Sequence, residues 1–161
     1  MTDSVPENKI SAWLWPIAGA ILCLGLGTAS GLATVSGGGA WYQGLMKPPG
    51  TPPPWIFGPV WSVLYVLMGI AAGRLIHRRA GRAATFFVIQ FVLNLAWTPV
   101  FFGAHQVAAA MVILVMLWLV VAVMVFMALR LDLITGLILF PYLAWLCVAA
   151  ALNFSILRHN R

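Results

Sequence analysis

The side chains best suited to binding a ligand are aromatic and amide groups that recur at helical spacing within long apolar segments. Gln90 and Asn94 lie four residues apart, and Trp97 follows Asn94 by three, so these side chains share one helical face. In the preceding apolar segment, Trp61 and Tyr65 are also four residues apart. Aromatic rings supply flat apolar surfaces and amides supply hydrogen-bonding groups, so these faces together can line a binding pocket.

A third face, with a three-four-four spacing, lies near the C-terminus and consists of Tyr142, Trp145, Ala149 and Asn153. With a rise of about 1.5 Å per residue, Trp61 lies about 9 Å and Asn94 about 12 Å inside one end of their helices, and Trp145 lies about 18 Å from the same end. These depths predict an aromatic pocket near that end of the molecule. The alternative is that the tryptophans only pack between helices and that the asparagines join helices, at about 1 kcal/mol each.

Other chemistries lack the residues that they need. The acidic residues Asp3, Glu7 and Asp132 all lie outside the long apolar segments, so the usual intramembrane proton relay or cation site is not expected. Cys23 and Cys147 belong to no cysteine or histidine cluster, and no metal site is predicted. There is no phosphate-binding glycine loop and no nucleophile paired with a base, so we predict no catalytic residue and no required cofactor.

The segments that carry these faces are long enough to cross a membrane. The sequence is 63% hydrophobic and only 7% charged, with a mean hydropathy of +1.00, which is typical of a protein solvated by lipid. A bilayer core needs about 20 apolar residues of helix, and five stretches qualify: 13–35, 55–76, 83–102, 107–129 and 133–157. We therefore predict an all-α membrane protein, a single domain of five transmembrane helices. The first stretch could instead be a signal peptide, but it is longer than a typical one and acidic residues precede it.

The connection between the first two stretches, 36–54, is much longer than the others. It begins with Gly37, Gly38 and Gly39 and ends in a proline-rich sequence. Glycines can act as a hinge, and prolines favour stiff, extended backbone. We expect a long Pro-rich loop that forms a lid over the pocket, with a plain connector as the alternative; the lid includes Lys47, Pro48, Pro53 and Trp55.

The basic residues predict how the chain is oriented in the membrane. Six lie at one end of the five stretches, namely Lys9, Arg74, Arg78, Arg79, Arg82 and Arg130, and three lie at the other, namely Lys47, Arg158 and Arg161. The positive-inside rule then places the N-terminus in the cytoplasm and the long loop and C-terminus outside. The net positive charge is explained by topology, and no nucleic-acid partner is predicted.

Three blocks of residues occur in the order and spacing of a known family. The first contains Trp41-Tyr42, Leu45, Lys47-Pro48, Pro52-Pro53, Trp55, Phe57, Trp61 and Leu64-Tyr65. The second contains Gln90, Asn94, Ala96-Trp97, Pro99 and Phe101-Phe102-Gly103, and the third contains Pro141-Tyr142-Leu143-Ala144-Trp145 and Leu152-Asn153. Together they resemble the tryptophan-rich sensory protein and translocator protein family over residues 41–158.

The resemblance implies a five-helix bundle in the lipid bilayer, often a homodimer, that binds porphyrins such as protoporphyrin IX and haem under the first loop. It implies ligand contacts at Tyr42, Trp61, Asn94, Trp97, Trp145, Ala149 and Leu152. Tyr65, which shares a face with Trp61, completes the predicted ligand-binding set. A GxxxG pair, Gly27 and Gly31, fits either a dimer contact or close packing within the bundle.

The chain departs from the family pattern at three places. Pro49 and Gly50 stand where the family usually has a tryptophan, which weighs against porphyrin breakdown. Phe154 replaces the tyrosine of a cholesterol motif, so cholesterol is disfavoured as a partner. His105 replaces a basic residue after the third stretch, where it is either a solvated turn residue or a ligand for haem iron.

These observations favour a membrane receptor or sensor for tetrapyrroles. The alternatives are light- and oxygen-dependent breakdown of protoporphyrin, and transport of porphyrins or sterols across the bilayer. The sequence shows no alternating-access repeat or coupling-ion site, so transport ranks below sensing.

Overall fold

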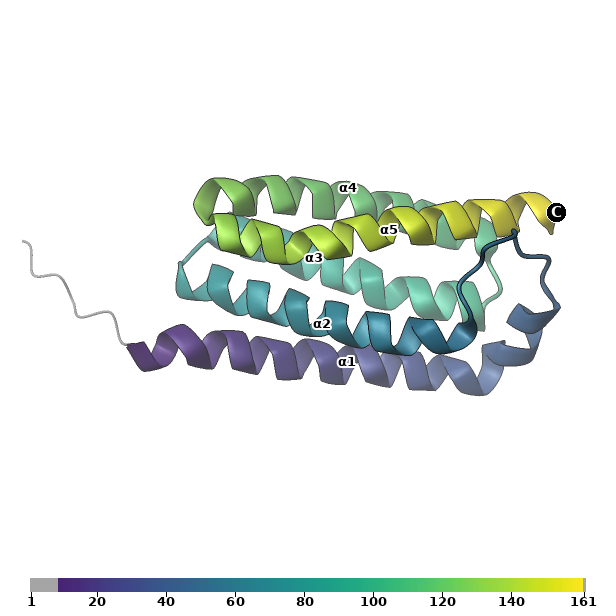
Figure 1. The fold of residues 1–161 in the computed structure, drawn as a ribbon, viewed down its shortest axis with the longest axis horizontal. Helices are drawn as coiled ribbons and strands as arrows, with labels where there is room; N and C mark the ends of the chain where they lie inside the picture. The colour runs from purple at the N-terminus through teal and green to yellow at the C-terminus, as the bar shows by residue number, and fades with distance from the viewer. Residues whose placement is uncertain (1–8, 161) are drawn as a thin grey trace, which may run out of the picture.

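Five long helices lie side by side in one bundle (Figure 1). The structure is a computed structural model that describes the backbone of residues 9–160 and the side chains of residues 12–32 and 39–160. The helices are α1 (Lys9–Gly44), α2 (Pro54–His77), α3 (Gly81–Thr98), α4 (Val107–Leu131) and α5 (Leu133–His159), and a π-helical turn, η1 (Pro99–Gly103), continues α3. The predicted all-α fold with five long helices is confirmed.

The two ends of the bundle differ in what they contain (Figure 1). The start of α1, the α2–α3 connection and the α4–α5 connection lie together at one end, which we call the arginine end. The α1–α2 connection, η1 and the end of α5 lie at the other, which we call the loop end. Arg161, which contributed to the predicted orientation, lies outside the described residues.

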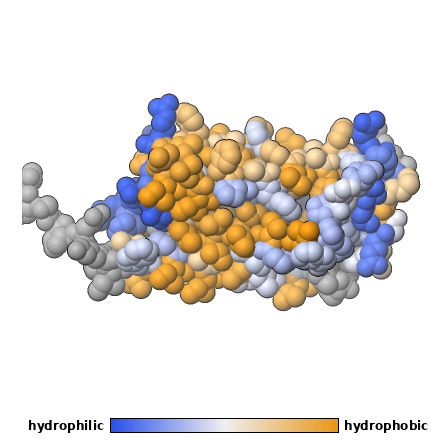
Figure 2. Space-filling model, in the orientation of Figure 1, coloured by the Kyte–Doolittle hydropathy of each residue, from blue (hydrophilic) through white to orange (hydrophobic). Residues whose placement is uncertain are grey.

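Five segments are long and apolar enough to cross a membrane, one in each long helix, with the third covering α3 and η1 together. They are Ala12–Leu32, Pro54–His77, Gly81–Gly103, Val107–Leu131 and Leu133–His159. Large apolar side chains point outward from them, as at Val112, which is 60% exposed, and Phe126, which is 57% exposed. Figure 2 shows hydrophobic residues over the middle of the molecule and hydrophilic residues at its two ends. Such a surface is suited to lipid, so the prediction of a multi-pass membrane protein is confirmed.

The first helix is longer than predicted, and the loop is correspondingly shorter. We expected the helix to end at residue 35 and the glycines at 37–39 to form a hinge, but α1 continues to Gly44 and the connection covers only residues 45–53. Glycine costs about 1 kcal/mol relative to alanine within a helix. The last turns of α1 offset this cost by packing Trp41 and Tyr42 against the aromatic rings of η1.

The π-helical turn η1 results from a proline at the end of α3. Pro99 has no amide hydrogen to continue the helical ladder, and the chain closes instead with bonds from the Ala104 amide to the Pro99 carbonyl (2.8 Å) and from the Gln106 amide to the Val100 carbonyl (3.1 Å). His105 follows in the left-handed region, with φ of 56°. The chain thereby reverses direction into α4, and η1 holds Phe101 and Phe102 at the loop end.

Glycines allow α1 and α2 to pack very closely. A Cβ atom added to Gly69 would collide with the backbone of Gly19, and one added to Gly73 would collide with the backbone of Trp15 and Pro16. Gly27 faces the ring of Tyr65, whereas Gly31 has open space around it. Gly27 therefore packs within the bundle, and the small-residue pair at this seam, Gly69 and Gly73, lies on α2.

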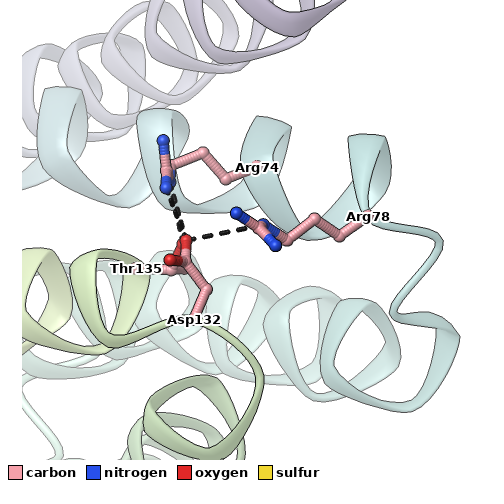
Figure 3. A network of polar contacts seen from close by, with 4 residues as sticks. All are labelled: Arg74, Arg78, Asp132 and Thr135. Atoms are coloured by element: carbon pink, nitrogen blue, oxygen red, sulfur yellow. Dashed lines mark hydrogen bonds and ion pairs between the residues drawn. The ribbon is translucent and has the colours of Figure 1, made fainter. Parts of the chain in front are cut away.

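At the arginine end, an ion pair ties α2 to the α4–α5 connection (Figure 3). The Arg74 Nη2 donates to Asp132 Oδ2 at 2.5 Å, and its Nε donates to Thr135 Oγ1 at 2.8 Å. The Thr135 hydroxyl donates to the same carboxylate oxygen, and Arg78 Nε lies 3.6 Å from it. Partial burial works to raise the pKa of Asp132, but the hydrogen bonds from Thr135 and Arg74 and the charges of Arg74 and Arg78 outweigh it and lower the pKa to about 2.

Candidate ligand-binding site

The side chains predicted to form the pocket meet at a small cavity inside the bundle. Its lining comes from four helices and consists of Trp61 of α2, Asn94 and Trp97 of α3, Leu114 and Leu117 of α4, and Ala149 of α5. The cavity has a volume of about 10 Å³, enough for about one water molecule. A ligand larger than water therefore requires the surrounding side chains to move apart.

A buried chain of hydrogen bonds holds Asn94 in place. The Tyr65 hydroxyl donates to Asn94 Oδ1 at 2.9 Å, and Asn94 Nδ2 donates to the Tyr142 hydroxyl oxygen at 3.0 Å. The Tyr142 hydroxyl in turn donates to Gln90 Oε1 at 3.0 Å. These groups join α2, α3 and α5 at a depth where lipid offers no hydrogen bonds, so each bond fixes the rotation of its helix.

One donor of this chain has no partner. Gln90 is fully buried, and its Nε2 makes no hydrogen bond to any described residue. An unmade bond at a buried amide costs about 1 to 3 kcal/mol. Among the described residues, Gln90 Nε2 is thus the one buried side-chain nitrogen or oxygen without a hydrogen-bond partner.

Trp97 connects the cavity to the aromatic cluster at the loop end. Its ring stacks on Phe101 with centroids 5.1 Å apart, and Tyr42 packs against Phe102 at 5.5 Å. The Asn153 amide, oriented to suit both of its neighbours, accepts a hydrogen bond from Trp97 Nε1 at 3.3 Å and donates to the Val107 carbonyl at 3.1 Å. Tyr42 therefore does not line the cavity. It belongs to the aromatic cluster at the loop end, Trp41, Tyr42, Phe101 and Phe102, which we call the roof.

The 45–53 connection is fastened over this roof. The Lys47 ammonium lies 4.7 Å from the centre of the Tyr42 ring and donates to the carbonyls of Gln43 and Leu45. Both the amide and the hydroxyl of Thr51 donate to the Pro48 carbonyl, which closes a turn.

Two hydrogen bonds between Asn160 and the backbone of Met46, which we call the clasp, join the C-terminal end of the chain to this connection. Asn160 Oδ1 accepts from the Met46 amide at 2.9 Å, and its Nδ2 donates to the Met46 carbonyl at 3.0 Å. The clasp joins residues 114 positions apart in the sequence.

The predicted residues divide into groups according to where they lie. Trp61, Asn94, Trp97 and Ala149 line the cavity, and Tyr65 is bonded to Asn94. Trp145 instead lines a separate groove between α2 and α5, and Leu152 is half-buried on α5 outside the cavity lining. Of the predicted lid residues, Pro53 ends the connection just before α2, and Trp55 lies in the first turn of α2, where it is 73% exposed. The binding roles of these residues stay predictions.

Sequence reasoning did not select Leu114 and Leu117 for the cavity. They lie on α4, which is apolar except for Arg130 in its last turn and has no amide or tyrosine to mark an inward face. Their spacing of three residues is the only sign, and many other leucine and valine pairs on α4 share it. Among the described residues, no group of three histidine, cysteine or acidic side chains could hold a metal ion.

Comparisons with known proteins show which family the chain belongs to. Residues 19–158 match the model of the TspO/MBR family. The chain is 42% identical over 127 residues to protein CrtK of Rhodobacter capsulatus, covering 76% of this chain and 79% of that protein. It is 40% identical over 121 residues to a tryptophan-rich sensory protein of Cereibacter sphaeroides, covering 74% and 77%. It is also 36% identical over 153 residues to the translocator protein of Homo sapiens, covering 90% of each chain. The chain therefore belongs to the TspO/MBR family of multi-pass integral membrane proteins.

Proposed function

We propose that this protein is a membrane sensor that binds tetrapyrroles, such as protoporphyrin IX or haem, between Trp61 and Trp97. The observation that carries the proposal is that two indole rings and the Asn94 amide, from α2 and α3, line the same buried cavity. A porphyrin is a flat apolar disc with carboxylates at its edge. Indole faces suit the disc, and amide or ammonium groups suit the edge.

The small volume of the cavity determines which parts of the protein would have to move for a ligand to bind. Because the cavity holds about one water molecule, binding of a tetrapyrrole there would require α2 to separate from α3 or the roof to lift. The roof lies at the loop end, where the Asn160 clasp, aromatic packing and the contact of Lys47 with the Tyr42 ring hold it. Ligand entry that displaces Tyr42 and the 45–53 connection would change the outer surface, which is how a sensor can report occupancy.

Tryptophan fluorescence quenching by protoporphyrin IX tests the proposal in detergent-purified protein. We expect saturable quenching in the wild type and an affinity at least about tenfold weaker, equivalent to about 1.4 kcal/mol, in Trp61→Ala and Trp97→Ala. The matched control is Trp13→Ala, because Trp13 is 73% exposed and lies outside both the cavity and the predicted lid. A thermal melt of each variant separates loss of binding from loss of folding.

A second variant blocks the cavity without removing an indole. Ala149→Leu adds bulk to the lining of the cavity, so it should weaken binding as strongly as Trp61→Ala. Equal, unsaturable quenching in all of these proteins, or equal weakening in Trp13→Ala, would contradict the proposal.

A further inference from the structure

The polar chain beside the cavity ends in a buried amide that lacks a partner. Gln90 of α3 is fully buried, and its Oε1 accepts a hydrogen bond from the Tyr142 hydroxyl at 3.0 Å. Its Nε2 has no hydrogen-bond partner among the described residues. An unpaired donor is costly inside a bundle surrounded by lipid, so a ligand that offers a hydrogen-bond acceptor to this group gains affinity from it.

The neighbours of Gln90 determine that its free group is a donor. The Tyr142 hydroxyl oxygen already accepts from Asn94 Nδ2, and the hydroxyl hydrogen bonds Gln90 Oε1. If the Gln90 amide were turned over, its Nε2 and Asn94 Nδ2 would both donate to the same oxygen, and the hydroxyl hydrogen would lose its acceptor. The chain therefore ends in an N–H group that requires an acceptor.

Gln90 lies next to the cavity, on the side away from the roof. Gln90 Oε1 and Asn94 Nδ2 are each 3.0 Å from the same Tyr142 hydroxyl oxygen, and Asn94 lines the cavity. Gln90 also precedes Trp97 by seven residues on α3, which places it about 10 Å farther from the loop end. A ligand that enters from the roof and extends past Asn94 would therefore meet Gln90 at its inner end.

The charges around the site determine which edge of a tetrapyrrole can face inward. The cavity lining and the polar chain contain no charged side chain. Lys47, by contrast, lies over the Tyr42 ring of the roof. An ionised carboxylate without a countercharge is costly in the bundle interior, so the carboxylates belong at the roof, near Lys47 and water. The opposite edge of the disc then points towards Gln90.

We propose that Gln90 is a specificity-determining residue, whose Nε2 donates to an uncharged carbonyl oxygen on the edge of the tetrapyrrole opposite its carboxylates. This inference rests on the proposed function and names the class of tetrapyrrole that the site prefers. The vinyl groups that protoporphyrin IX carries on this edge leave the amide unpaired, whereas a carbonyl oxygen pairs it. The site should therefore prefer tetrapyrroles with an oxygen on this edge over protoporphyrin IX itself.

The test compares two porphyrins that differ at this edge alone. Protoporphyrin IX and diacetyldeuteroporphyrin IX share the disc and both carboxylates, but the second has acetyl groups where the first has vinyl groups. Affinities are measured by tryptophan fluorescence quenching in detergent-purified protein. We expect the wild type to bind the diacetyl compound about three- to tenfold more tightly, the gain from one hydrogen bond to a buried donor. Equal affinities, or a preference for protoporphyrin IX, would overturn the proposal.

Gln90→Leu removes the donor, so the ratio of the two affinities should fall to about one. The matched control is Gln106→Leu, the same change at an exposed glutamine outside the cavity lining, and it should keep the wild-type ratio. If a thermal melt shows that Gln90→Leu does not fold, Gln90→Met, with an unbranched side chain of similar length, replaces it.

The ratio separates this inference from the function on which it rests. Trp61→Ala should weaken the binding of both porphyrins and leave their ratio unchanged, because its indole faces the disc and not the inner edge. Saturable binding of both porphyrins with an unchanged ratio in the Gln90 variant would overturn the role of Gln90 alone. Unsaturable quenching by both porphyrins in the wild type would overturn the proposed function and this inference with it.

Discussion

At the scale of single residues, the Tyr142 hydroxyl joins the polar chain of the bundle. It accepts a hydrogen bond from Asn94 and donates one to Gln90, and both groups are buried. Tyr142→Phe removes both bonds and leaves a buried amide unpaired, so we expect the free energy of unfolding to fall by about 1 to 2 kcal/mol. Reversible unfolding in mixed detergent micelles measures this. The matched control is Tyr42→Phe, because the Tyr42 hydroxyl makes no hydrogen bond to the described residues; an equal loss in both variants would contradict the role of Tyr142.

The same residues show how far the candidate site could be predicted from the sequence. The four-residue spacing of Gln90 and Asn94 was enough to place both on an inward face, because polar groups in hydrocarbon must find partners. The position of Trp145 beside a lipid-facing groove was not predictable, because depth along a helix does not fix the rotation of α5 against α2. That rotation depends on packing between α2 and α5, including that of Pro59 and Pro141.

At the scale of elements, the contact between α1 and α2 depends on Gly27. An added Cβ atom there would collide with the Tyr65 ring, which carries the first donor of the polar chain. We expect Gly27→Ala to lower the melting temperature and to weaken the bond between Tyr65 and Asn94. Gly31→Ala is the control, since its Cβ atom meets open space and alanine is favoured in a helix by about 0.5 to 1 kcal/mol. A Gly27→Ala variant as stable as Gly31→Ala would contradict the close packing.

The ion pair at the arginine end should make the stability of the α2 to α5 contact depend on pH. Because the pKa of Asp132 is lowered from its ordinary value of 3.8 to about 2, the folded state favours the ionised carboxylate. This contribution is fully present above about pH 4 and is lost as the pH falls towards 2. We expect the melting temperature to fall over that interval.

Asp132→Asn supplies the control for this pH dependence. Asp132 is the only acidic residue within the described part of the chain, so the variant should be less stable at neutral pH and should lose most of the change between pH 4 and 2. A wild-type curve parallel to that of Asp132→Asn would show that the carboxylate does not stabilise the fold.

The elements that were hardest to predict are those whose ends depend on tertiary contacts. The four later helices lie close to their predicted boundaries, since apolar length and turn residues determine them. The end of α1 was predicted wrongly because local propensity favours a break at three glycines, whereas Trp41 and Tyr42 gain contacts with η1 only when the helix continues.

At the scale of the whole molecule, the arginine end and the loop end of the bundle differ in their charge and in the contacts that hold them together. The arginine end contains Lys9, Arg74, Arg78, Arg79, Arg82 and Arg130, whereas the described loop end contains Lys47 and Arg158. The loop end is closed by the Asn160 clasp and aromatic rings. If the site opens through its roof, the orientation decides which compartment detects an occupied site.

We predict that the arginine end faces the cytoplasm, because basic residues near the ends of membrane segments are retained on that side. In a background of Cys23→Ala and Cys147→Ala, single cysteines are placed at exposed, uncharged positions so that the charge difference is kept: Pro49→Cys at the loop end and Gly81→Cys at the arginine end. A membrane-impermeant maleimide should label Pro49→Cys in intact cells, and Gly81→Cys only after the membrane is permeabilised. The reverse pattern would place the roof in the cytoplasm. Labelling of both sites in intact cells would mean that the difference of six to two in basic residues of the described chain does not fix one orientation.

A sensor with its roof outside would receive its ligand from the external side and would have to signal to the cytoplasm through α2. This helix carries Trp61 of the cavity lining in its first half and Arg74 of the ion pair in its last turn.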